Sequence, residues 1–223
     1  MPYLSQKHAA KSTAEFSKTL DWALRFVLII ALPATIGMAI LSGPILTTLL
    51  QYGKFTAFDV LMVQRSLLAF TLGIPAFMLV KVLASGFYSC QNIKTPVRIA
   101  VIAMLSNIVL AALLIFPLKH AGLALATSLS SSLNAGLLLW TLIQKNYFQL
   151  QHGWKLFIAQ LFFANSAMAT LLLFTTTDLP QWSAWSSLTR VWHLGLLCVA
   201  AVAVYVLCLW ISGVRWRQLF SYE

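Results

Sequence analysis

The ionisable residues that could carry chemistry are few in this chain of 223 residues. Charged side chains make up 9% of it, and five of them are acidic. These five lie at the ends of apolar segments or between them: Glu15, Asp21, Asp59, Asp178 and Glu223. They form no carboxylate pair, and no serine or cysteine stands beside a plausible base, so the groups for acid–base or nucleophilic catalysis are missing. The sequence therefore predicts no catalytic residue and no enzyme activity.

Residues that could ligate a metal are equally scattered. The three cysteines and four histidines stand at Cys90, Cys198, Cys208, His8, His120, His152 and His193. They form no C-x-x-C motif and no other ligand spacing. We therefore expect no metal site, no disulfide framework and no cofactor.

One basic side chain, Lys81, is expected inside an apolar segment. It stands six residues before Phe87, which puts it roughly 9 Å from the segment end at ~1.5 Å of rise per residue. A lysine at this depth either snorkels to the interface or faces a wet cavity, where it attracts an anion. Gly73 and Pro75 kink the same segment and favour the cavity, but the sequence leaves both alternatives open.

Long apolar segments must position these residues. The chain is 60% hydrophobic, with a mean hydropathy of +0.84. About 20 helical residues cross a bilayer, and six segments reach that length: 22–41, 66–87, 97–116, 121–143, 156–176 and 191–211. Backbone polar groups need partners in lipid, so such segments must be helices. The expected fold class is all-α, a polytopic membrane protein with six transmembrane helices.

Lysine and arginine near the segment ends predict the orientation. One set of connections holds ten of them: Lys7, Lys11, Lys18, Arg25, Lys94, Arg98, Lys145, Lys155, Arg215 and Arg217. The opposite set holds four: Lys54, Arg65, Lys119 and Arg190. Cytoplasmic connections carry the excess of positive charge, so both termini are expected in the cytoplasm. The net charge of +10 is dispersed and does not predict nucleic-acid binding.

The expected organisation has three parts. Residues 1–21 form a cytoplasmic or interfacial helix, with charge pairs at helical spacing and without the apolar core of a signal peptide. Residues 22–144 hold four transmembrane helices, and residues 145–223 hold two peripheral ones and a cytoplasmic tail. Aromatic and basic side chains gather at membrane interfaces, and the expected anchors are Trp22, Lys54, Trp182 and Trp185.

Small side chains follow one stripe of the fourth segment. They recur at every fourth position, at Gly122, Ala126, Ser130 and Asn134. Such a stripe lets a neighbouring helix approach closely. Whether Asn134 serves only this seam or also lines a polar cavity, with Ser106 and Asn107 of the preceding helix, stays open.

Three stretches resemble the C-terminal half of the MurJ (MviN) lipid II flippase family. They are LSGPILTTLLQYGKFTAFD at 41–59, KVLASGFYSCQNIKTPVRIA at 81–100 and PLKHAGLALATSLSSSLNAGLLLW at 117–140. The resemblance implies the multidrug/oligosaccharidyl-lipid/polysaccharide exporter fold, with fourteen helices in two six-helix lobes around a cationic cavity and two extra helices. The six segments here would correspond to helices nine to fourteen.

The same resemblance implies a function. Family members move a lipid-linked peptidoglycan precursor from the cytoplasmic to the periplasmic leaflet of the bacterial inner membrane by alternating access. The implied partners are this lipid and an N-terminal half with the first eight helices, without which we expect no activity. The candidate substrate-binding residues are Lys81, Arg25, Asn107 and Asn134. The alternatives are an exporter of another lipid-linked oligosaccharide or small substrate, and a membrane remnant that transports nothing.

Overall fold

The computed structural model describes residues 2–213, and residues 2–14 by their backbone alone. Within this part of the chain there are nine helices and no strand, so the all-α prediction is confirmed. They are α1 (Pro2–Ile40), α2 (Ser42–Leu50), α3 (Ala57–Thr71), α4 (Ile74–Ser89), α5 (Lys94–Leu118), α6 (His120–Gln144), α7 (Trp154–Thr175), α8 (Leu179–Ala184) and α9 (Ser187–Ile211).

Six segments of the described chain are long and apolar enough to cross a membrane. They are Glu15–Ile40, Ala57–Ser89, Lys94–Leu118, His120–Gln144, Trp154–Thr175 and Ser187–Ile211. Each contains or closely overlaps one predicted segment, so the predicted set of six is confirmed. The second consists of two helices, α3 and α4.

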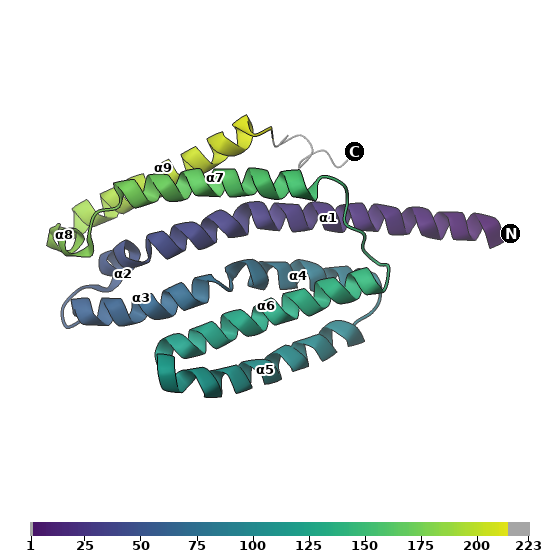
Figure 1. The fold of residues 1–223 in the computed structure, drawn as a ribbon, viewed down its shortest axis with the longest axis horizontal. Helices are drawn as coiled ribbons and strands as arrows, with labels where there is room; N and C mark the ends of the chain where they lie inside the picture. The colour runs from purple at the N-terminus through teal and green to yellow at the C-terminus, as the bar shows by residue number, and fades with distance from the viewer. Residues whose placement is uncertain (1, 214–223) are drawn as a thin grey trace.

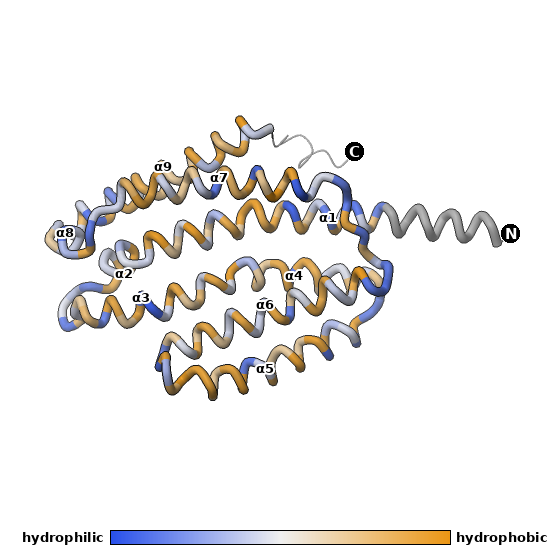
Figure 2. Tube along the Cα trace, in the orientation of Figure 1, coloured by the Kyte–Doolittle hydropathy of each residue, from blue (hydrophilic) through white to orange (hydrophobic). Residues whose placement is uncertain are grey.

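The helices lie side by side along the long axis, with α1 between two groups (Figure 1). Helices α7 and α9 lie on one side of α1, and α3 to α6 lie on the other. We call these the α7–α9 side and the α3–α6 side. One end of the molecule, the α8 end, carries α2, α8 and the α5–α6 turn. The opposite connector end carries the α4–α5 and α6–α7 connections, and hydrophilic residues gather at both ends (Figure 2).

The core forms two hydrophobic clusters that meet at α1. The cluster on the α7–α9 side includes Ala164 and Leu172, and the one on the α3–α6 side includes Leu83 and Leu142. Trp154, at the start of α7, packs against both. Helix α1 is therefore a wall shared by the two groups.

Helix α1 is continuous across the boundary expected at residues 21 and 22. Its N-terminal part extends beyond the other helices (Figure 1). Pro33 lies inside it without ending it, which membrane helices tolerate when neighbouring groups satisfy the freed carbonyl. The expected lead-in and the first transmembrane segment are thus one helix, and the C-terminal tail with Arg215 and Arg217 lies outside the described residues.

Candidate functional site

The second membrane-spanning segment is interrupted where the sequence predicts a kink. Helix α3 ends at Thr71 and α4 begins at Ile74, so Gly73 lies between them. The Gly73 N–H donates to the carbonyl of Phe70 at 3.0 Å. This acceptor lies three residues back, where an α-helix would use the one four residues back. Pro75 has no N–H to donate. The break therefore leaves carbonyl groups of α3 without helical donors.

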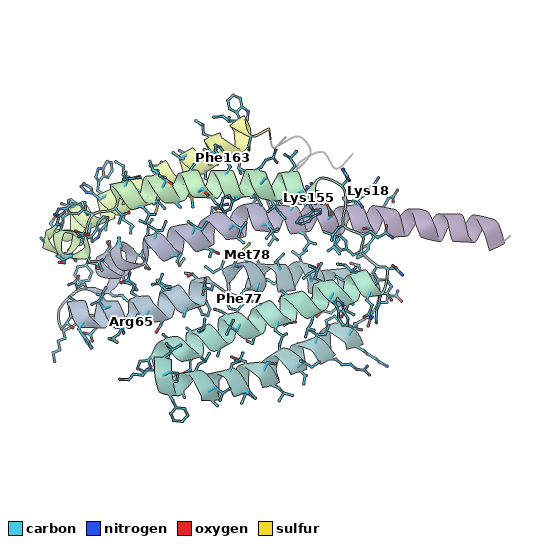
Figure 3. The ribbon with its side chains drawn as sticks, in the orientation of Figure 1. Lys18, Arg65, Phe77, Met78, Lys155 and Phe163 are labelled. Carbon is cyan, nitrogen blue, oxygen red and sulfur yellow. The ribbon has the colours of Figure 1, made fainter. Side chains whose placement is uncertain are left out.

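A serine of α6 supplies a donor at this break. Ser128 Oγ lies 2.7 Å from the carbonyl oxygen of Ala69 and 3.2 Å from that of Phe70. A Cβ on Gly73 would lie 2.8 Å from the same Oγ, so the close contact requires glycine there. Phe77, labelled in Figure 3, packs beside the break with its ring centroid 5.1 Å from that of Phe70. Ser128 thus joins α6 to the last turn of α3 at the break, and α6 packs against both α3 and α4.

Two cavities flank the break, and the exposed Leu72 lines both. The larger, of about 650 Å³, lies between α3 and the α5–α6 turn and has Arg65 and Lys119 in its wall. The smaller, of about 380 Å³, lies between α1, α4 and α6, and its wall is apolar apart from Ser132 and the indole of Trp154. We call them the α3–α6 cavity and the α1–α4 cavity.

Lys81 lies on α4 and is exposed. Neither cavity includes it, and within the described residues it has no hydrogen bond or ion pair. Both alternatives for Lys81, snorkelling and a cavity cation, therefore stay predictions.

Asn107 and Asn134 share a feature that the sequence does not reveal. Both side-chain oxygens are buried and have no hydrogen-bond partner among the described residues. Asn107 stands 12 residues before Lys119, where α5 and α6 join, and Asn134 stands 15 residues after it. At ~1.5 Å per residue this places them within about one turn of the same height. Such unpaired buried oxygens are rare and mark a place where another group is expected.

The seam between α5 and α6 is nevertheless tight. A Cβ on Gly122 would lie 2.2 Å from the carbonyl oxygen of Leu114. Ala126 and Ser130 of the same stripe are buried. The close approach predicted from the small-residue stripe is therefore confirmed at Gly122.

Arg25 is engaged at the connector end, in a set of contacts that we call the α1–α7 cluster. Its Nε donates to Asp21 Oδ2 at 2.8 Å, and its Nη2 donates to the carbonyl of His152 at 3.2 Å. The other carboxylate oxygen, Asp21 Oδ1, accepts from Trp154 Nε1 at 2.6 Å and from the Gln151 N–H at 3.3 Å. Asp21 is buried. These bonds join α1 to the α6–α7 connector and account for Arg25 without a substrate.

Arg190 forms the centre of a second set of contacts at the α8 end. The side chain is buried, and its Nε donates to the carbonyl of Trp185 at 3.0 Å. Its two terminal nitrogens donate to the carbonyls of Thr47, at 3.3 Å, and Ser183. One arginine thereby joins α2, α8 and α9, a role that the sequence analysis missed because it counted Arg190 only as a loop charge.

Trp182 completes this α2–α9 cluster. It was expected at a membrane interface, but it is 1% exposed, and its Nε1 donates to Thr48 Oγ1 at 3.0 Å. Its place is thus in the core. Trp22 and Trp185 are half-buried and Lys54 is exposed, so their roles as interfacial anchors remain predictions.

Comparison with known proteins tests the resemblance seen in the motifs. A family model described as lipid II flippase MurJ matches residues 1–193. The chain belongs to the MurJ family. Its relatives include the probable lipid II flippases MurJ of Vibrio cholerae, 39% identical over 98% of this chain, and of Haemophilus influenzae, 36% identical over 99%. The lipid II flippase MurJ of Burkholderia cenocepacia is 34% identical over 97%.

A solved structure extends this MurJ similarity to the fold. The structure, a lipid II flippase MurJ in an inward closed conformation, superposes with a TM-score of 0.71 at 25% identity, over 92% of this chain and 40% of its own. The chain also spans 42%, 44% and 42% of the three relatives named above, less than half their length. These shares agree with the C-terminal correspondence drawn from the motifs. A multi-pass membrane protein of a transporter family is thereby established.

Proposed function

We propose that this chain forms the C-terminal part of a lipid II flippase, which moves the lipid-linked peptidoglycan precursor from the cytoplasmic to the periplasmic leaflet of the inner membrane. The relatives that align with 97–98% of this chain are named lipid II flippase MurJ or probable lipid II flippase MurJ. Since the chain spans less than half their length, transport requires the remaining part, from the same polypeptide or a second one. The chain alone is expected to be inactive.

The observation that carries this proposal is the state of the polar groups on α4, α5 and α6. Among the described residues, Lys81 is exposed and has no partner, and the side-chain oxygens of Asn107 and Asn134 are buried and have none. Polar groups at membrane depth are costly and mark substrate paths. In this proposal, Lys81 contributes positive charge to a cavity for the precursor's diphosphate, and the two amides face the cavity or the rest of the transporter.

The broken helix α3–α4 supplies the movable element. Alternating access needs helices that bend around a binding site. At the break, Ser128 donates to carbonyl oxygens of α3, and such a hydroxyl can change its acceptor. By contrast, α7 is joined to α1 through the indole of Trp154 and α9 to α2 through the guanidinium of Arg190. We infer that the α3–α6 side rearranges and that the α7–α9 side moves as a unit with α1.

Rescue of flipping tests the function. Cells depleted of their own flippase would express this chain with a segment that supplies the missing helices, and the precursor in the outer leaflet would be measured. We expect rescue with both parts and none with either part alone. Stable insertion of both parts without rescue would refute the transport function.

Lys81 is tested in the rescuing pair. We expect Lys81→Glu to abolish rescue and Lys81→Ala to reduce it, whereas Lys81→Arg keeps it. Unchanged rescue with Ala and Glu would leave Lys81 only an anchoring role. The exposed Lys94 provides a matched control, since Lys94→Ala should have no effect.

The proposed orientation puts the connector end in the cytoplasm and assigns both termini to the same side of the membrane. Lys18 and Lys155 lie at that end (Figure 3). A membrane-impermeant maleimide added to intact cells should label Lys54→Cys and leave Lys94→Cys unlabelled until the cells are opened. Cys90, Cys198 and Cys208 are free thiols, so they would first be replaced by serine, and the cysteine-free chain would give the background. Labelling of Lys94→Cys from outside would reverse the orientation.

A further inference from the structure

The α3–α6 cavity brings basic residues together at the α8 end. Arg65 of α3, labelled in Figure 3, lines it together with Lys119 and His120 of the α5–α6 turn. All three are exposed, and no acidic residue lines the cavity. The rest of the wall is largely apolar, with Leu68 and Leu125 among its residues. A cavity with basic groups and an apolar wall suits an amphiphilic anion.

The basic groups are not neutralised by the protein. The one ion pair of the described side chains, Asp21–Arg25, lies at the opposite end of the molecule. The acid of α3, Asp59, is used in a capping box, where its Oδ2 accepts from the N–H of Thr56 at 2.8 Å and from Thr56 Oγ1 at 2.7 Å. Arg65 therefore keeps an uncompensated charge.

The α5–α6 turn holds its two basic residues rigidly. Lys119 is the single residue between α5 and α6, with φ at +50°. Its N–H donates to the carbonyl of Ile115 at 2.9 Å, and its carbonyl accepts from the Gly122 N–H at 3.1 Å. The tight contact at Gly122 fixes the angle between the helices. The backbone at Lys119 and His120 is thus fixed beside the cavity, so binding need not order this part of the chain.

At the α8 end, this cavity collects a large share of the lysines and arginines. The sequence places four lysines and arginines there, and two of them line this cavity. Of the others, Arg190 is buried against backbone carbonyls, and Lys54 lies in a loop. We propose that the α3–α6 cavity binds the phosphate headgroup of an anionic membrane lipid at the α8 end, with the lipid chain along its apolar wall. Guanidinium and ammonium groups both bind phosphate well.

Binding to this cavity goes beyond transport and can be measured on the 223-residue chain itself. The chain would be purified in detergent, and its complexes with phosphatidylglycerol, phosphatidylcholine and a polyprenyl diphosphate would be quantified by native mass spectrometry. We expect the two anionic lipids to bind at least tenfold more tightly than phosphatidylcholine. Equal binding of the three would overturn the proposal. A preference between the two anionic lipids would identify the headgroup.

Substitutions locate the site. We expect Arg65→Gln with Lys119→Gln to lower the affinity for phosphatidylglycerol tenfold or more, and the matched pair Lys54→Gln with Lys94→Gln to leave it unchanged. Equal losses in the two pairs would indicate nonspecific attraction and refute the site. Circular dichroism would verify folding of each variant.

Two further measurements keep the test independent of charge and of the ligand source. Leu125→Trp, at a half-buried position of the cavity wall, would narrow the cavity and leave its basic residues in place, so lipid binding should fall; unchanged binding would contradict the site. Inorganic diphosphate should not displace the lipid at equal concentration. Displacement would identify a free anion as the ligand and overturn the lipid proposal.

Discussion

The two sides of α1 use their polar residues differently. On the α7–α9 side, Asp21, Arg25 and Arg190 have hydrogen-bond partners within the chain. On the α3–α6 side, the buried side-chain oxygens of Asn107 and Asn134 have no hydrogen-bond partner in the part of the chain that the structure describes. The contrast is strong but incomplete, because Asn165 and two threonines at the end of α7 also have unpaired oxygens.

This difference separates permanent contacts from contacts that await another group. A buried polar group left unpaired costs about 1–3 kcal/mol, so proteins seldom keep one without a reason. The α1–α7 and α2–α9 clusters are satisfied and fix the peripheral helices to the rest. The α5–α6 seam is as closely packed but carries polar atoms that only a substrate, a water or the rest of the transporter can satisfy.

The largest expected effect is the loss of the α1–α7 cluster. Asp21→Ala would leave the Arg25 guanidinium and the Trp154 indole without their acceptor. Because Arg25 is partly exposed, we discount the cost of a broken buried pair to about 2–3 kcal/mol. Denaturant unfolding in detergent would measure it. The exposed Asp178 gives the control. If Asp178→Ala lowers the unfolding free energy as much as Asp21→Ala does, the α1–α7 cluster has no special role in stability.

A second variant tests whether the α5–α6 seam is tight. Gly122→Ala would force a Cβ against the Leu114 carbonyl and should cost about 2 kcal/mol of unfolding free energy. The control is Gly136→Ala in the same helix, where a Cβ would meet nothing within 4 Å. It should be neutral or stabilise by up to about 1 kcal/mol. Equal effects of the two changes would mean that the seam is loose and its amides merely disordered.

The α2–α9 cluster gives a smaller effect. Trp182→Phe would remove the donor to Thr48 Oγ1 and part of a buried ring, at a cost of about 1–2 kcal/mol. Trp192, on α9, is 72% exposed and serves as the control. Thermal unfolding of the two variants should differ clearly. If Trp192→Phe costs as much, the cluster does not fix the peripheral helices.

Asn134 is the position where we expect the smallest effect on stability together with a clear effect on transport. Asn134→Leu would replace an unpaired buried amide by an apolar group of similar size, so stability should change by less than about 1 kcal/mol. Rescue of flipping by the complete transporter should nevertheless fall. Gln144→Ala, at the exposed C-terminal end of the same helix, should alter neither measurement. Normal rescue with Asn134→Leu would reduce Asn134 to a seam residue.

Hydropathy and helix breakers allowed much of the fold to be predicted. The six membrane segments, the break at Gly73 and Pro75 and the tight stripe through Gly122 depend on residues close in sequence. The second segment begins earlier than predicted, because the capping box of Thr56 and Asp59 starts α3 at Ala57, ahead of the charged Asp59 and Arg65.

The clusters could not be predicted, because their partners are distant in sequence. Arg190 and Thr47 are separated by 143 residues, and Arg25 and His152 by 127. A single sequence carries no signal for such pairs, so a buried arginine resembles a loop charge and a buried tryptophan resembles an interfacial anchor. Likewise, only the three-dimensional structure reveals that Asn107 and Asn134 have no partner for their side-chain oxygens among the described residues.

Since α1 is a wall common to both hydrophobic clusters, any tilt of this helix during a transport cycle must be passed to α7 and α9. The exposed Trp192 would then act as an optical reporter. A fluorophore at that position lies far along the chain from the broken helix α3–α4. It would report movement of α9 without altering the residues at the break.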